Sequence, residues 1–488
     1  MIRPSEEEYN KIRSLNLYKR VPISTEILSD IKTPIEVLRI LKNVSTHCYL
    51  LESAEDKKSW GRYTFLGYDP KLEITCRSNK MKIGSEEFIT KNPNDEIRKI
   101  LNDYKSCRFD YLPPFTGGLV GYFSYDYIKY FEPTLNLDAQ DTEGFNDIDL
   151  MLFDKVIVFD NLIQKIVIVN NISLEEDNAF ENGVKELQKI VDLIKHGEPA
   201  KDKKGKLLSD FKLLFSKEEY CEIVEKSKHH IKEGDIFQIV PSNRMEAEYE
   251  GTLLNTYRVL RTLNPSPYMF YFSSNDMEVA GASPETLVKL ENGILHTFPL
   301  AGTRPRGKTA AEDIALEEDL LKDEKELAEH NMLVDLGRND LGKICKFGTV
   351  EVESYHQILR FSHVMHIGST VRGEILPKYD ALDAVAAVLP AGTLSGAPKI
   401  KACQLINDLE NNKRGIYGGA VGYIDFTGNM DTCIGIRLAY KKKGKVFVRS
   451  GAGIVADSIP EKEFQECVNK AKAVVSAIRM AEEDLWYF

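Results

Sequence analysis

Residues 417–450 read YGGAVGYIDFTGNMDTCIGIRLAYKKKGKVFVRS, and this stretch decides between the main classes of mixed fold. It contains three strand-like runs rich in β-branched and aromatic residues, at 417–426, 430–440 and 445–450. The two short connections between them each contain a glycine, which is typical of tight turns between antiparallel strands. A meander without intervening helices favours an α+β protein over a doubly wound nucleotide-binding fold.

Local signals elsewhere in the chain predict further elements. The β-branched runs 155–159 and 165–169 predict a hairpin around Asp160 and Asn161. Ser216 and Glu219 have capping-box spacing, which predicts a helix that ends at Gly234.

The last helix is predicted by a similar pattern. Ser458 and Glu461 again have capping-box spacing, and Pro460 falls in the first turn, where its missing N–H group costs nothing.

The clearest change in composition lies at 196–210, where Gly, Pro and several lysines interrupt the periodic pattern. We take this break as the boundary between an N-terminal region, 1–205, and a catalytic region, 206–488.

The composition is that of a soluble globular protein, with 43% hydrophobic and 28% charged residues among 488. The net charge of -11 argues against nucleic acid or an anionic membrane as a partner, because both are bound by clustered Lys and Arg. No apolar run reaches the roughly 18 residues of a membrane span, and the N-terminus lacks a signal pattern. The eight cysteines are dispersed and lack C-x-x-C spacing, which is typical of buried free thiols. We therefore expect a cytoplasmic protein that acts on a small molecule.

Two acidic pairs are the first chemical signal. Glu326 with Glu329, and Glu463 with Glu466, each lie three residues apart in a helical stretch, so each pair shares one helix face. Four such carboxylates could bind a hard divalent cation such as magnesium. Taken alone, Glu pairs at this spacing are more often solvated helix surface.

The stretch 302–309, GTRPRGKT, fits the pattern of a phosphate-binding loop. This alternative predicts an ATPase or kinase. Pro305 weakens it, because such loops bind phosphate through consecutive backbone N–H groups and proline has none.

Seven longer blocks resemble the chorismate-utilising enzymes, in the same order along nearly the whole chain. They are NPSPYMF at 264–270, ASPE at 282–285, PLAGTRPRG at 299–307, ELAEHNMLVDLGRND at 326–340, SHVMH at 362–366, PAGTLSGAPK at 390–399 and SGAG at 450–453. The resemblance implies a large α+β sandwich of two antiparallel-rich sheets with helices packed outside. It also implies that Glu329 and Glu466 hold magnesium, with Glu326 and Glu463 in support.

Members of this family make different products from chorismate, and two positions help to separate them. Where water-using relatives carry a basic lysine this chain has Gln238, and an amide cannot deprotonate water. Where aminodeoxychorismate-forming relatives carry a nucleophilic lysine it has Ala301, which excludes a covalent intermediate there. The resemblance therefore implies that chorismate and ammonia give anthranilate and pyruvate, with aminodeoxychorismate synthesis as the alternative.

The resemblance also assigns roles to single residues. Glu285 would act as general acid on the departing ring hydroxyl, ammonia would attack near Gln238, and His366 would assist pyruvate release. Thr393 is expected with these catalytic residues. The other expected substrate contacts are Gly302, Thr303, Tyr417, Arg437, Gly451, Ala452, Gly453 and Lys470.

A second site is implied by the anthranilate branch of the family, in which tryptophan binds as an inhibitor. The residues expected there are Glu52, Ser53, Pro267, Tyr268 and Met269. An ordinary strand end at 50–53 is the alternative.

The sequence contains no segment typical of a glutamine amidotransferase. We therefore expect this chain to use free ammonia and a separate glutamine amidotransferase subunit to supply it. A regulatory protein that only binds chorismate or tryptophan is the non-enzymatic alternative.

Overall fold

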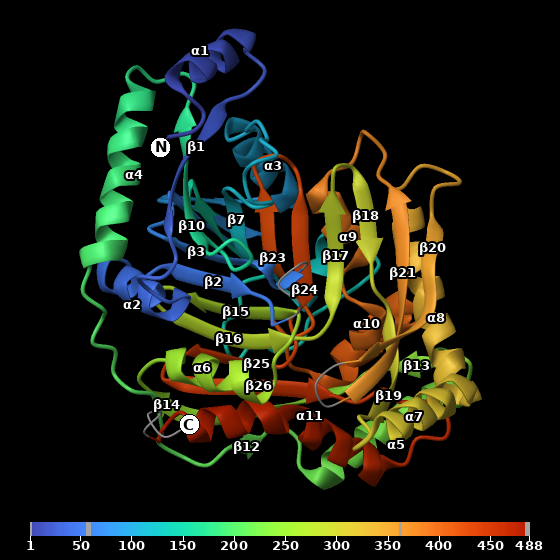
Figure 1. Cartoon of the computed structure of the whole chain (residues 1–488). Helices are drawn as coiled ribbons and strands as arrows, with labels where there is room; N and C mark the ends of the chain where they lie inside the picture. Colours follow the sequence, from blue (N-terminus) through green and yellow to red (C-terminus); the bar gives the residue numbers. More distant parts are fainter. Residues whose placement is uncertain (1, 55–59, 361–363, 484–488) are drawn as a thin grey trace.

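The computed structural model describes residues 2–54, 60–360 and 364–483. Two large β-sheets lie face to face, and helices cover their outer faces (Figure 1). The strands pair in antiparallel fashion, for example β2 with β15 and β7 with β23. The predicted α+β sandwich with two antiparallel-rich sheets is confirmed.

The first sheet has eleven strands in one path and β12 beside β14. In spatial order they are β1 (Arg20–Leu28), β10 (Lys165–Ser173), β9 (Lys155–Asp160), β3 (Tyr63–Tyr68), β2 (Cys48–Glu52), β15 (Tyr268–Ser273), β16 (Met277–Ser283), β25 (Leu438–Lys442), β26 (Lys445–Gly451), β14 (Ser242–Glu250) and β11 (Lys206–Leu207), with β12 at Lys212–Leu213.

The second sheet is built in the same way, with β20 beside β21. Its order is β19 (Leu300–Pro305), β21 (Val364–Glu374), β18 (Ile294–Thr297), β17 (Thr286–Glu291), β24 (Met430–Ile434), β23 (Ala420–Asp425), β7 (Gly118–Phe123), β8 (Ile148–Phe153), β4 (Leu72–Arg77), β5 (Lys80–Ile83) and β6 (Glu86–Ile89), with β20 at Glu351–Arg360. A separate short pair joins β13 (Gln238–Ile239) to β22 (Gly396–Ala397).

The helices pack on the outside and at the lower end of the sandwich in Figure 1. They are α1 (Glu6–Leu15), α2 (Pro34–Val44), α3 (Pro93–Asp103), α4 (Ala179–His196), α5 (Lys217–Lys232), α6 (Leu254–Leu263), α7 (Ala310–Lys322), α8 (Glu324–Gly342), α9 (Ala381–Val388), α10 (Lys399–Glu410) and α11 (Pro460–Met480), with short 3-10 turns η1 (Trp60–Arg62), η2 (Tyr125–Tyr130) and η3 (Gly392–Leu394).

Strand β9 shows why the central strands are apolar on both faces. Ile157 and Phe159 point into a core shared with α2 and α4, whereas Val156 and Val158 point into the core between the two sheets. Burial on both faces explains the continuous hydrophobic run that the sequence shows here.

The predicted boundary at 205/206 falls in the connection between α4 and β11. Strands from both sides of it alternate within each sheet: β2 pairs with β15, and β7 pairs with β23. The two regions therefore share one sandwich core.

Two local predictions are confirmed. β9 and β10 form the predicted antiparallel hairpin. Helix α5 begins with a complete Ser216/Glu219 capping box, and Gly234 follows its end with φ of 81°.

The prediction of one strand over 430–440 is wrong. The run is divided between β24 in the second sheet and β25 in the first, with a crossing between them. At this crossing Arg437 adopts φ of 52°, which is uncommon for a residue other than glycine. Apolar periodicity could not show the break, because the strands on both sides of it are largely buried.

The capping box predicted at Ser458 and Glu461 is also wrong. Helix α11 begins one residue later, with Ile459 as the N-cap and Pro460 at N1. The Ser458 hydroxyl instead accepts a hydrogen bond from the N–H of Val455, 3.1 Å away, so it closes the preceding turn.

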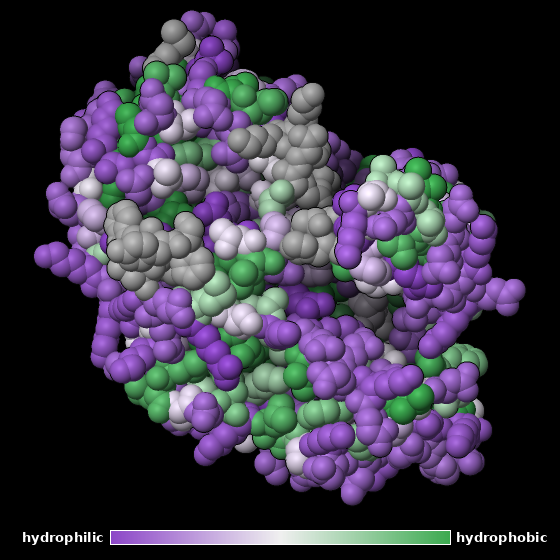
Figure 2. Space-filling view, turned by 60° about the horizontal axis from the view of Figure 1, so that its bottom comes forward, coloured by the Kyte–Doolittle hydropathy of each residue, from purple (hydrophilic) through white to green (hydrophobic). Residues whose placement is uncertain are grey.

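Figure 2 shows that hydrophilic residues cover much of the lower face, and that this face is hollowed between the left and right parts of the molecule. No helix in the described part of the chain is long and apolar enough to cross a membrane.

Candidate active site

The two predicted acidic pairs lie on helices α8 and α11. Burial is the main cause that raises the pKa of Glu326, and the nearby charge of Glu329 adds to it. Burial also raises the pKa of Glu463, Glu466 adds to it, and Lys325 of α8 opposes it. This effect of Lys325 across helices indicates that the start of α8 lies near the start of α11. Each pair is thus a concentration of negative charge that a cation would stabilise.

Magnesium fits this donor set by its chemistry. The ion commonly takes only one or two protein carboxylates and completes its shell with water and substrate. Within residues 2–54, 60–360 and 364–483, no three or more His, Cys, Asp or Glu side chains form a ready metal cluster. Glu466 Oε1 lies 2.6 Å from Lys470 Nζ, so at least one of the predicted ligands has a cationic partner within the chain.

Glu285 lies between β16 and β17, and its raised pKa suits a general acid. Burial raises its pKa to about 7, while a hydrogen bond from Thr393 and the charge of Lys470 oppose the rise. The Thr393 hydroxyl, in η3, donates to Glu285 Oε1 over 3.1 Å. A carboxyl with this pKa can carry a proton at neutral pH and donate it.

His366 lies on β21 directly opposite Thr303 of β19. Its Nδ1 is 2.9 Å from the carbonyl oxygen of Gly302 and 3.1 Å from Thr303 Oγ1. Because a carbonyl oxygen only accepts, Nδ1 carries the proton, and Nε2 of the neutral ring does not. Burial lowers the pKa of His366, which favours this neutral form. The ring can therefore accept a proton.

Gln238 lies on β13, with its side chain against the acidic helix. Its Nε2 is 3.5 Å from Glu329 Oε1, at the limit of a hydrogen bond. Its Oε1 is buried and has no hydrogen-bond partner within the described part of the chain. A Cβ added to Gly453 would lie 3.0 Å from Gln238 Nε2, so the SGAG segment at 450–453 passes close to this amide.

The remaining predicted substrate residues lie around the crossing from β24 to β25. Arg437 Nη1 donates to the backbone oxygen of Lys470 over 2.6 Å. Tyr417 is buried, and a Cβ added to Gly451 would lie 3.2 Å from its hydroxyl. The next residue, Ala452, is also buried and donates its N–H to Pro241, 3.3 Å away.

These contacts join distant segments into one site. Lys470 links three of these residues. Its charge opposes the rise in the pKa of Glu285, its backbone oxygen accepts a hydrogen bond from Arg437, and its ammonium group forms an ion pair with Glu466. Of the SHVMH block, Ser362 and His363 lie outside the described residues.

A separate cavity of about 330 Å³ lies between the two sheets, and we call it the inter-sheet cavity. All five residues expected at the second site line it: Glu52, Ser53, Pro267, Tyr268 and Met269. The carboxylate of Glu52 is bound by α6, since Tyr257 donates to it over 2.5 Å and Arg261 Nε lies 2.5 Å away. Glu52 is therefore held in place by the protein itself.

Asp431 of β24 lines the same cavity and was not found by sequence reasoning. It accepts a 2.8 Å hydrogen bond from Tyr268, and burial raises its pKa to about 6. The only signal in the sequence is an ionisable residue within a strongly apolar strand.

Known proteins resemble this chain over nearly its whole length. Residues 46–476 match the profile of the chorismate binding enzymes. The chain is 44% identical to anthranilate synthase component 1 of Acetivibrio thermocellus, over 96% of this chain and 97% of that one. It is 46% identical to the protein of the same name from Aquifex aeolicus, over 96% of each chain. The chain belongs to the chorismate-binding enzymes.

A solved structure in this family is also similar in fold. The crystal structure of anthranilate synthase component I from Streptococcus pneumoniae superimposes with a TM-score of 0.77 at 39% identity, covering 85% of this chain and 92% of that one.

In this chorismate-binding enzyme the stretch 302–309 is not built as a phosphate loop. Its first part belongs to β19, an antiparallel strand paired with β21. The N–H groups of Gly307 and Lys308 donate to Asp313, over 2.6 Å, and to Glu312, over 2.7 Å. Carboxylates of α7 thus occupy the donors that a phosphate would need.

Proposed function

We propose that this chain converts chorismate and ammonia to anthranilate, with release of pyruvate and water. The main support for this proposal is the buried amide of Gln238, which lies beside Glu329. The oxygen of this amide has no hydrogen-bond partner within the described residues. An amide oxygen accepts a hydrogen bond from ammonia but cannot act as the base that water would need.

The chain's own groups supply the proton transfers. Protonated Glu285 donates to the ring hydroxyl, so that its C–O bond breaks and water leaves while the C–N bond forms. The added nitrogen releases one proton. As the enolpyruvyl C–O bond breaks, the neutral His366 accepts the proton of the ring carbon that carries this nitrogen, the departing enolate takes up a proton at its methylene carbon to give pyruvate, and the ring becomes aromatic. Arg437 and Tyr417 bind the enolpyruvyl carboxylate and hold the substrate between these groups.

We propose that magnesium is held by Glu329 and Glu466, with Glu326 and Glu463 acting through water. When bound, the ion supplies positive charge for the ring carboxylate. The raised pKa of Glu326 and of Glu463 supports this role, because burial and a neighbouring carboxylate both disfavour their charge.

The direct test uses the purified chain with chorismate, magnesium and ammonium at mildly alkaline pH. Anthranilate fluorescence and pyruvate release should rise together, and chelation should abolish both. Consumption of chorismate without pyruvate would contradict the proposal and indicate aminodeoxychorismate. Pyruvate released together with a hydroxylated product would indicate attack by water.

We further propose that the inter-sheet cavity binds tryptophan and that this inhibits the reaction. Its volume, the five expected residues and the partly buried Asp431 support an amino acid with a large apolar side chain. Residues 1–205 would contribute Glu52 and Ser53. Millimolar tryptophan should slow turnover and raise the melting temperature, and indifference of both would contradict this role.

We also propose that a separate glutamine amidotransferase subunit provides ammonia in the cell. The purified chain should be active with ammonium and inactive with glutamine. Addition of such a subunit should confer glutamine-dependent activity, and glutamine use by the chain alone would contradict the proposal.

A further inference from the structure

A buried ion pair lies behind the candidate active site, at the end of α10. Glu410 and Arg414 have side chains only 0% and 2% exposed. Their contact is bidentate: Arg414 Nε donates to Glu410 Oε2 over 3.1 Å, and Nη2 donates to Oε1. The chain turns back between them at Asn411, which adopts φ of 42°.

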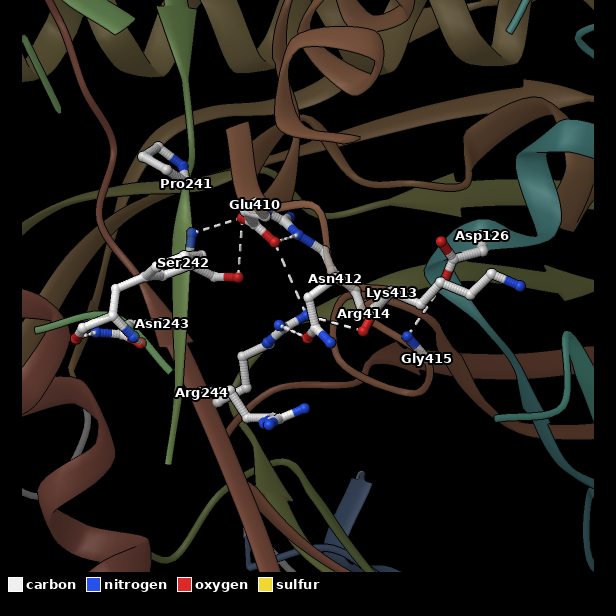
Figure 3. Close-up of polar contacts among 12 residues, drawn as sticks. Asp126, Pro241, Ser242, Asn243, Arg244, Glu410, Asn412, Lys413, Arg414 and Gly415 are labelled. Carbon is white, nitrogen blue, oxygen red and sulfur yellow. Dashed lines mark hydrogen bonds and ion pairs between the residues drawn. The ribbon is translucent and has the colours of Figure 1, made fainter. Parts of the chain in front are cut away.

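The pair binds the backbone of three separate segments. Arg414 Nη1 donates to the carbonyl oxygen of Leu394, and Nη2 to that of Val240, each over 2.6 Å. Glu410 Oε1 accepts from the N–H of Ser242 over 2.7 Å and from its hydroxyl over 3.0 Å. Figure 3 shows Ser242 on its strand facing Glu410.

Each of these segments carries a residue of the candidate active site. Leu394 directly follows Thr393, the donor to Glu285. Val240 lies two residues after Gln238, and its N–H bonds Ser395, so these two segments are also bonded to each other. Ser242 is paired in register with Gly451, the first glycine of the SGAG segment at the end of β26.

Two tyrosine rings and a second arginine also surround the Glu410–Arg414 ion pair. The Arg414 guanidinium lies 4.6 Å from the ring centre of Tyr125 and 5.8 Å from that of Tyr417. A second arginine, Arg449 of β26, lies 3.8 Å from Glu410 Oε2 and donates to the oxygen of Lys413 over 3.1 Å. The ion pair therefore also contacts β26, the strand that carries the first half of the SGAG segment.

Stability alone does not explain such a pair. Burial of two charges is costly, and well-packed apolar residues are often at least as stabilising. What apolar residues cannot supply is a set of directed hydrogen bonds that fixes three backbones at once.

We propose that Glu410 and Arg414 are positioning residues that fix the relative positions of Gln238, Thr393 and the Gly451–Gly453 segment around chorismate. This inference rests on the proposed function. The pair acts through the backbone and does not itself contact substrate.

The test compares Glu410→Gln with the wild-type enzyme in the anthranilate assay. The amide keeps the shape but loses the charge-assisted bonds, so KM for chorismate should rise about tenfold and kcat should fall about tenfold. A merely structural role would reduce the active fraction and leave KM unchanged.

Two further variants keep the test decisive. Ser242→Ala removes one bond to Glu410 and should raise KM for chorismate about threefold, even if Glu410→Gln does not fold. Glu278→Gln is the matched control: Glu278 is a buried carboxylate on β16 that bonds Lys42 and Lys441 at a distance from the site. It should lower the melting temperature and leave KM unchanged.

Wild-type KM in both Glu410→Gln and Ser242→Ala would overturn the positioning role. Absence of wild-type turnover would instead overturn the proposed function, on which the role rests.

Discussion

The candidate active site and the inter-sheet cavity are built from different parts of one sandwich. The cavity is lined mainly by strands of the two sheets, which are held by their hydrogen-bond ladders. The active-site groups come instead from helices, strand ends and turns, such as Glu285 before β17 and Thr393 in η3. A binding cavity therefore forms once the two sheets pack, whereas the reactive groups need additional tertiary contacts to hold them.

The two regions meet at Tyr268. Its hydroxyl donates to Asp431 in the inter-sheet cavity and lies 3.0 Å from Thr286 Oγ1. Thr286 directly follows Glu285, the proposed acid. One side chain thus contacts both the cavity and the segment that carries the reactive carboxyl.

The largest expected effect is a loss of turnover that leaves tryptophan binding in the inter-sheet cavity unchanged. Glu285→Gln removes the proposed proton donor, so turnover should fall by about 10²- to 10⁴-fold. Tryptophan should still raise the melting temperature of the variant by the wild-type amount. Turnover within a few-fold of wild type would remove Glu285 from the mechanism.

The converse variant is Asp431→Asn. We expect the Asp431 carboxylate, which lines the inter-sheet cavity, to bind the amino group of tryptophan. Its loss should therefore weaken tryptophan binding by about 10- to 100-fold, because a charge-assisted hydrogen bond is lost. Calorimetry measures this affinity, and turnover without tryptophan is the control. Since the pKa of Asp431 is raised to about 6, wild-type affinity should increase as the pH rises through that value. An affinity independent of pH would contradict the role of Asp431.

Tyr268→Phe tests whether the Tyr268 hydroxyl couples the inter-sheet cavity to the candidate active site. The variant should still bind tryptophan, but turnover at saturating tryptophan should be about tenfold higher than in the wild type. Initial rates at saturating tryptophan measure this residual activity. Full inhibition in the variant would show that the hydroxyl does not couple the two regions.

The smallest effect concerns pH. At saturating chorismate and a fixed concentration of free ammonia, kcat should fall about fivefold between about pH 7 and 8 as Glu285 loses its proton. The sign follows from burial, which raises the pKa of Glu285 to about 7, so that the acid form is lost above this value. The Glu285→Gln variant should lack this titration, and a wild-type profile that is flat over the same range would contradict the assignment.

Local chemistry made part of the fold predictable. The capping box of α5 and the β9–β10 hairpin depend on residues within one or two turns of each other, and both were predicted correctly. Ser458 shows the limit of this reasoning, because capping-box spacing predicted that its hydroxyl caps α11, whereas it accepts the N–H of Val455 in the preceding turn.

The candidate site was named from the sequence only through the resemblance to a family. Spacing alone could not distinguish the Glu326/Glu329 pair from a solvated helix face. It also could not indicate that Gln238, some 90 residues earlier, lies beside Glu329.

Sequence patterns alone predicted the α+β class and the helices that carry the acidic pairs, and they show which residue types are available for proton transfer. Tertiary structure alone decided that the run 430–440 crosses between sheets at Arg437 and that Glu410 with Arg414 is buried. The physical reason is range: turns and caps depend on neighbouring residues. In contrast, the burial of an ion pair and the sheet that a strand joins depend on segments hundreds of residues away.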